Sequence, residues 1–211
     1  MMARKKLVMM MQEAGLPSAY QRIEYLEASG TQYIATNYIP SAGVNVRLEF
    51  AITQTYSGDK MFAGVTQNGN QCYMELYASQ RWYCANAEKK YSSVMGMNNA
   101  TIQAMLGNKH IFTMSSVETT VDISGVGSAS PTDTVNEPTI PIYIFAWNNG
   151  GTAQYKHNCA RIYDLQFSNG DSLSAHFIPC IRKSDNEPGM YDTVSKTFYT
   201  NSGTGTFIIP S

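Results

Sequence analysis

The chain has 211 residues, 15% charged side chains and a formal net charge of −1, with 15 basic against 16 acidic residues. This balance excludes a strong basic field, so we expect neither nucleic acid nor an anionic membrane surface as a partner. The length suits one main all-β domain, and 14 Tyr and 16 Gly residues are typical of strands joined by tight turns.

The N-terminal stretch "MMARKKLVMMMQEAG" predicts a short helix over residues 3–14, with Leu7, Met10 and Met11 on one face. Its apolar run is too short for a signal peptide or a membrane span, which favours synthesis and residence in a reducing cytosol. The Met-rich stripe has two interpretations: it packs on its own domain, or it docks on a partner chain.

After Pro17 the hydrophobic pattern changes to period two. "VNVRLEFAIT" places Val44, Val46, Leu48, Phe50 and Ile52 on one face, as in a strand with one buried side. Further strands are predicted at 60–65, 71–77, 81–86, 110–116, 118–123, 140–147, 160–168 and 173–178. Turn signals such as Asn68-Gly69 separate them, and residues 125–141 are predicted to form a long loop. Many short strands at this spacing predict an all-β sandwich or jelly roll.

The four cysteines are Cys72, Cys84, Cys159 and Cys180, without a CxxC pair or a histidine at zinc spacing. No metal site is predicted. In a reducing compartment we expect buried thiols, whereas Cys72 and Cys84 would pair across a hairpin only in a secreted protein.

Two motifs resemble a known family. Residues 16–40, "LPSAYQRIEYLEASGTQYIATNYIP", are similar to the opening of concanavalin A-like (laminin G-like) jelly-roll modules of tailed phages and gut bacteria. Residues 161–207, with "FIPCIRKSDNEPGMYD" and "FYTNSGTGTF", resemble the end of the same pattern. The resemblance covers about residues 16–208, is loose in the middle, and leaves residues 1–15 outside. We therefore divide the chain into an N-terminal helical docking segment, 1–15, and a concanavalin A-like jelly-roll domain, 16–211.

The resemblance implies an all-β, two-sheet antiparallel jelly-roll sandwich whose first and last strands lie side by side. For residues 177–192 we expect a strand, a turn and a strand, with Pro179 ending the first strand. The hairpin loop is predicted over 185–189, with Gly189 free to adopt a positive φ. Gly30 is predicted to serve a tight turn.

The sequence does not predict an enzyme. Glucanases of this fold carry Glu-x-Asp-x-x-Glu on one strand, because retaining hydrolysis needs two carboxylates about 5 Å apart, and no such run is present. His110, His157 and His176 are scattered, and no G-x-S-x-G nucleophile pattern occurs.

Sugar sites on sandwiches combine an exposed aromatic ring with amides or carboxylates. The candidate glycan-binding residues lie in "RWYCAN" and "AWNNGGTAQY": Trp82, Tyr83, Trp147, Asn148, Asn149 and Tyr155. A buried strand is the favoured interpretation for Trp147, and Trp82 fits core or surface equally well. Calcium, which lectins of this fold often hold, lacks an acidic loop of sufficient ligand density, so no cofactor is predicted.

The resemblance implies a phage virion protein, a capsid- or tail-associated fibre or decoration made in the bacterial host cytoplasm. We expect other virion proteins as partners, a homo-oligomer with a trimer favoured, and host or mucin glycans as ligands of the jelly roll. The alternative is a free bacterial carbohydrate-binding adhesin module.

Overall fold

The computed structural model describes residues 16–54, 60–77, 81–94, 103–122, 127–154 and 159–210. These residues form two nine-stranded sheets, and a single helical turn at 103–105 is the one helix among them. The predicted helix over 3–14, with Leu7, Met10 and Met11, lies outside the described residues.

Sheet A has the strand order β10-β9-β4-β15-β16-β17-β18, with β1 beside β16 and β2 beside β15. Its strands are β1 (Tyr20–Arg22), β2 (Leu26–Ala28), β4 (Asn45–Ile52), β9 (His110–Met114), β10 (Thr119–Val121), β15 (Ala160–Asn169), β16 (Ser172–Arg182), β17 (Glu187–Asp192) and β18 (Thr197–Thr200). All of these pairings are antiparallel.

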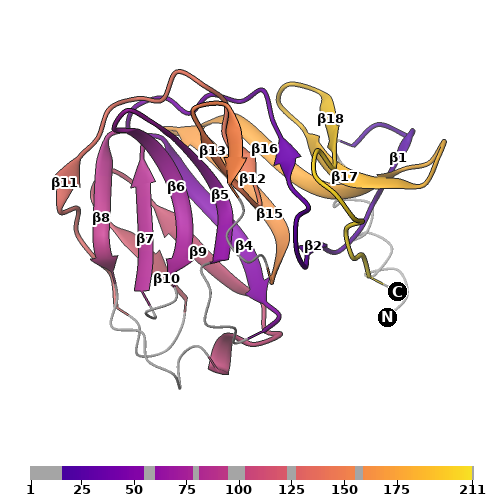
Figure 1. Ribbon diagram of the computed structural model, residues 1–211, viewed down its shortest axis with the longest axis horizontal. Helices are drawn as coiled ribbons and strands as arrows, with labels where there is room; N and C mark the ends of the chain where they lie inside the picture. The colour runs from indigo at the N-terminus through magenta and orange to yellow at the C-terminus, as the bar shows by residue number, and fades with distance from the viewer. Residues whose placement is uncertain are drawn as a thin grey trace.

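Sheet B has the order β11-β8-β7-β6-β5-β12-β3, and the hairpin β13–β14 joins it at β5. Its strands are β3 (Ile34–Ala35), β5 (Lys60–Gln67), β6 (Asn70–Tyr77), β7 (Arg81–Asn86), β8 (Lys89–Val94), β11 (Asp133–Thr134), β12 (Tyr143–Ile144), β13 (Trp147–Asn149) and β14 (Thr152–Gln154). Among its strand pairs, only β13–β5 is parallel. Figure 1 shows β5–β8 as one layer in front of β4, β9 and β10, which confirms the predicted two-sheet sandwich.

The core lies between the sheets and follows the alternation of the strands. All five apolar residues predicted to share one face around β4, from Val44 to Ile52, are buried. The ring of Phe50 on sheet A lies 4.9 Å from that of Phe62 on sheet B, measured between centroids. Alternation in β4 was therefore sufficient to identify its buried face.

Most strands form where the period-two pattern predicts them. The single strand predicted over 140–147 was wrong, because the chain reverses at Phe145 and forms the two short strands β12 and β13 instead. Strand β8, which was not predicted, has the polar sequence KKYSSV, and cross-strand pairing with β7 rather than hydrophobic alternation defines it. The predicted loop over 125–141 is mainly irregular where it is described. Within it, β11 pairs with β8 and covers that edge of sheet B.

The stretch 177–192 is a strand, a turn and a strand, as predicted, but three details were wrong. The turn covers residues 183–186, and residues 187–189 of the predicted loop already belong to β17. Strand β16 continues through Pro179 to Arg182, because β1 lies beside it and Ile23 N–H donates to the Pro179 carbonyl. The positive φ belongs to Asn186 and not to Gly189. Gly189 is needed for space, since a Cβ there would lie 2.2 Å from the Tyr199 carbonyl oxygen.

The first and last strands are not paired with each other, contrary to what the resemblance implies. β1 pairs with β16, and β18 pairs with β17. The two ends of the module nevertheless meet, because Glu27 at β2 forms a backbone bridge with Ile208 beyond β18. Figure 1 shows β1, β17 and β18 at one end of the molecule and β7, β8 and β11 at the other.

All four cysteines are free and buried, as expected for thiols in a core. Cys72 and Cys84 lie on neighbouring strands among the core residues.

Candidate functional site

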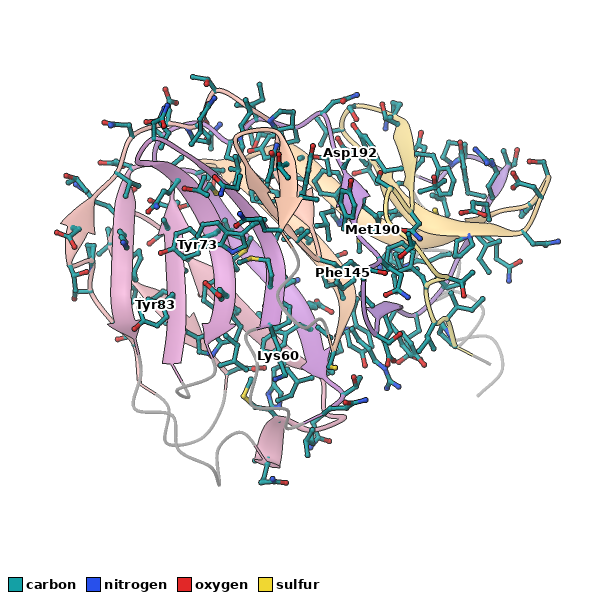
Figure 2. All side chains as sticks on the ribbon, viewed as in Figure 1. Lys60, Tyr73, Tyr83, Phe145, Met190 and Asp192 are labelled. Carbon is teal, nitrogen blue, oxygen red and sulfur yellow. The ribbon has the colours of Figure 1, made fainter. Side chains whose placement is uncertain are left out.

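The outer face of sheet B carries a second apolar cluster, separate from the core of the sandwich. Met61, Tyr73 and Ala85 are buried there, and three half-buried side chains pack against them: Tyr83, Val135 and Trp147. We call these six residues the Trp147 surface. Figure 2 shows Tyr73 and Tyr83 on the same face of the layer formed by β5–β8. Because the outer face of an antiparallel sandwich is usually polar, an apolar cluster there marks a candidate interaction surface.

Register explains how the cluster assembles. Gly64 on β5 is opposite Tyr73 on β6, which is opposite Ala85 on β7. In the next row, Met61 is opposite Glu75, and Glu75 is opposite Tyr83. Small residues therefore flank Tyr73 in one row, and a carboxylate stands beside Tyr83 in the other.

Trp147 is positioned by a close approach to Gly64. The two residues are register partners in the parallel β13–β5 pairing. A Cβ on Gly64 would lie 3.2 Å from Trp147 Cδ1 and 3.0 Å from Met61 Sδ. The indole ring instead packs against Tyr73, with ring centroids 4.9 Å apart and planes inclined by 35°. The absence of a side chain at Gly64 thus makes room for the indole.

A strained reversal precedes Trp147. β12 runs antiparallel to β5 and β13 runs parallel to it, so both Tyr143 and Trp147 are partners of Gly64. Between them Phe145 has a φ of 64°, a conformation that is rare for a bulky aromatic residue. Its N–H donates to the Phe62 carbonyl at 2.8 Å, which holds the reversal. Strained backbone of this kind tends to cluster at functional sites.

Asn148 supports the turn and is not available to a ligand. It is 1% exposed, its Nδ2 donates to the Pro141 carbonyl at 2.6 Å, and its Oδ1 accepts from Gly151 N–H at 2.8 Å. Its selection as a glycan-binding residue was therefore wrong. Asn149 is exposed at the end of β13, next to the Trp147 surface.

Trp82 is a core residue, so its selection as a glycan-binding residue was also wrong. It is 0% exposed and stacks between Phe62, at 5.3 Å and 15°, and Phe112, at 4.8 Å and 13°. Alternation on β7 places Trp82 inside and Tyr83 outside. Both faces of the indole are covered, which leaves no ring surface for a sugar.

Tyr155 lies outside the described residues. The residues that sequence reasoning missed on this face are Tyr73 and Met61. Alternation in "QCYMELY" places Cys72, Met74 and Leu76 in the core, so it could have assigned Tyr73 to the opposite face.

The electrostatic setting of the Trp147 surface is that of a desolvated aromatic cluster. Burial raises the pKa of Tyr73, and the nearby Cys84, Glu75 and Tyr83 raise it further. The Tyr73 hydroxyl thus stays neutral. Glu75 itself is only 4% exposed. Chemically, the surface offers rings for stacking beside polar groups, and not a pair of reacting groups.

On sheet A, Asp164 is the centre of a polar network. The His176 imidazole Nε2 lies 2.9 Å from Asp164 Oδ2, Gln166 Nε2 donates to Oδ1 at 2.7 Å, and Arg22 approaches to 3.6 Å. Elsewhere on this sheet His110 is close to Asp122, at 3.3 Å. In the described part of the chain, no three His, Cys, Asp or Glu side chains gather as metal ligands would.

The comparisons with known proteins found no matching family model and no curated protein of significant similarity. Within the described residues, none of the helical structure has the length and apolar character that crossing a membrane requires.

Proposed function

We propose that this chain is a phage virion component whose β-sandwich binds host or mucin glycans through the Trp147 surface. The observation that carries the proposal is the half-buried Trp147 ring, packed against Tyr73 on the outside of the sheet. A ring held in this way keeps part of its surface open while the strained turn and Gly64 fix its position.

Physical chemistry favours a sugar as the ligand of this surface. The C–H groups of a pyranose face pack on aromatic rings, while its hydroxyls need neighbouring polar partners. Trp147 and Tyr83 supply ring surface, and Asn149, two positions after Trp147 at the other end of β13, supplies an exposed amide. Because the rings belong to paired strands, binding would not require the sheet to reorganise.

The virion role rests on the resemblance of residues 16–40 and 161–207 and on the arrangement of the sheets. In the proposal, residues 1–15 dock on a larger assembly through Leu7, Met10 and Met11, and the particle carries the protein as a trimer. Strand β1, which follows this segment, lies at the opposite end of the molecule from β7 and β8 (Figure 1). Attachment at the β1 end would leave the outer face of sheet B available for ligands.

Glycan binding is tested by replacing Trp147 with Ala and measuring retention on immobilised mucin and on a glycan array. The matched control is Tyr25→Ala, which removes a half-buried ring that packs against Tyr163 on sheet A. We expect Trp147→Ala to abolish retention at unchanged folding, and Tyr25→Ala to retain it. A wild-type protein that binds no glycan, or equal binding by both variants, would contradict the proposal.

A free bacterial adhesin is the second candidate, since the same surface would serve it. Peptide mass spectrometry of density-purified phage particles separates the two. Peptides from residues 16–211 at a fixed ratio to the major capsid protein support the virion role. Their absence from particles and presence in bacterial fractions would favour the adhesin.

Particles formed with a chain lacking residues 1–15 test the docking segment. Normal incorporation of the shortened chain would contradict a docking role for residues 1–15.

A further inference from the structure

The outer face of sheet A contains a cleft of about 340 Å³, on the opposite sheet from the Trp147 surface. It spans β4, β9 and β15 and extends to the turn before β10. The lining residues are Asn45, Val46, Arg47, Thr113, Met114, Ser115, Glu118, Gln166 and Ser168. Its volume is near the lower end of the roughly 300–1,000 Å³ typical of small-molecule sites, so it suits a small ligand.

Arg47 is held in place on the cleft but keeps donors for a ligand. Its Nη2 lies 2.7 Å from Glu49 Oε1, and Lys109 pairs with the other oxygen of the same carboxylate. Lys109 also lies over the Tyr163 ring, 4.9 Å from the centroid. Two cations therefore share one carboxylate. A guanidinium has five N–H donors, and the contact between Arg47 and Glu49 leaves most of them available to a ligand.

The amide of Gln166 is oriented by the polar network next to the cleft. Its Nε2 donates to Asp164 Oδ1 at 2.7 Å, and an ionised carboxylate can only accept hydrogen bonds. The Gln166 amide therefore directs its nitrogen towards Asp164 and its oxygen away from it. The Oε1 atom makes no hydrogen bond with the described residues, so an oriented acceptor remains on the cleft.

Glu118 supplies the opposite charge. Its carboxylate forms no ion pair or hydrogen bond with the described residues, although its backbone N–H and carbonyl are held by Ser115. The side chains of Asn45 and Ser168 also make no hydrogen bond within the described part of the chain. The cleft thus combines unused acceptors with unused donors, and its two formal charges, Arg47 and Glu118, cancel.

We propose that this cleft is a second binding site, for a neutral hydroxyl-rich ring of monosaccharide size held by hydrogen bonds alone. None of the nine lining residues is aromatic, so stacking on a ring face is not available. Adjacent hydroxyls of a sugar donate to carboxylate and amide oxygens and accept from a guanidinium, which is the set of groups on the cleft. Glu118 would repel a purely anionic ligand, and Arg47 would repel a purely cationic one. The site does not depend on the Trp147 surface.

The test is NMR titration of the ¹⁵N-labelled full chain with glucose, galactose, mannose, N-acetylglucosamine, glucuronate and glucosamine. We expect at least one neutral sugar to shift amide signals of β4, β9 and β15, and Glu118→Gln and Arg47→Met each to weaken that binding about tenfold. Trp147→Ala should leave it unchanged, which separates this site from the one proposed on sheet B. The exposed turn variant Asp171→Asn is the matched control for the loss of one charge.

Three results would overturn the proposal. These are the absence of any shift at the cleft with all six compounds, binding that survives both cleft variants, and tighter binding of glucuronate or glucosamine than of every neutral sugar. Amide spectra of the free variants that overlay on the wild type establish that the fold is intact.

Discussion

Gly203 lies against the backbone of Thr31 so closely that a Cβ on Gly203 would be 2.0 Å from the Thr31 carbonyl oxygen. Around this contact, Gln32 Nε2 donates to the Thr206 carbonyl at 3.0 Å, and Ser202 N–H donates to the Tyr33 carbonyl at 2.8 Å. The opening motif and the closing motif, which are 173 positions apart at Thr31 and Thr204, therefore contact each other directly. We call this contact between residues 31–33 and 202–206 the joint.

Replacing Gly203 with Ala should destabilise the protein by about 3 kcal/mol, because the new methyl group meets backbone and not a movable side chain. Urea denaturation measures the change. Gly127→Ala is the matched control, since a Cβ there meets nothing within 4 Å. Equal stability of the two variants would show that the joint tolerates a side chain.

Replacing Gly64 with Ala tests the position of Trp147 without removing the ring. The added methyl group would lie 3.2 Å from Trp147 Cδ1 and 3.3 Å from Tyr73 Cβ, so the indole has to shift. If the proposed glycan site is correct, affinity should fall by about 1 kcal/mol, or roughly fivefold. Mucin retention and glycan titration provide the measurement, and Gly127→Ala again serves as the control. Unchanged affinity would mean that Trp147 does not contact the glycan.

Two substitutions of Trp82 distinguish the contribution of packing to stability from that of hydrogen bonding in the core. Trp82→Ala should cost about 3–5 kcal/mol, since a large cavity replaces a ring stacked on Phe62 and Phe112. Trp82→Phe should cost much less, because the buried indole Nε1 has no hydrogen-bond partner among the described residues and its removal relieves that penalty. Denaturant unfolding of the two variants checks this. Equal losses would indicate that the indole makes a contact that Phe cannot replace.

Asp164 should make stability sensitive to acid. Burial alone raises the pKa of its carboxyl, but the His176 hydrogen bond and charge, the Gln166 amide and Arg22 outweigh burial and hold the pKa below its usual range. A carboxyl whose pKa is lowered on folding stabilises the folded state at pH values above its unfolded-state pKa, about 3.9. This stabilisation is lost as the pH falls through the folded-state pKa.

Asp164→Asn should therefore lower stability at pH 7 by about 1–3 kcal/mol and flatten the decline below about pH 4. Unfolding curves between pH 2 and 7 measure both effects. Asp171→Asn, at an exposed turn position, should reproduce the wild-type profile. A profile for Asp164→Asn that is as steep as the wild type would assign the acid sensitivity to other carboxyls.

The thiols should react slowly in the folded state. Burial raises the pKa of Cys84 and of Cys180 to about 12 and raises that of Cys72 as well, so little thiolate forms at neutral pH. Cys159, which is 9% exposed, should be labelled first. Alkylation with iodoacetamide followed by peptide mass spectrometry gives the order, with urea-unfolded protein as the reference. Rapid native labelling of Cys72 or Cys84 would show that the core opens.

Alternation along single strands predicted which side chains of those strands face the core. The five apolar residues around β4 face the core as their spacing predicts, and the alternation of β6 separates Met74 from Tyr73. These are local consequences of the two-residue period of a strand, so they can be derived without knowing which strands are neighbours.

Only the tertiary structure decided which polar and aromatic residues meet. Alternation puts the adjacent residues Trp82 and Tyr83 on opposite faces of β7, but packing against Phe62 and Phe112 decides that Trp82 is the one in the core. The place of Trp147 depends on Gly64, 83 positions earlier by their numbering, and the cleft on sheet A depends on the neighbours β4, β9 and β15. Such sites form between strands that are distant in the chain. Their composition therefore follows from strand order and register, which local periodicity does not encode.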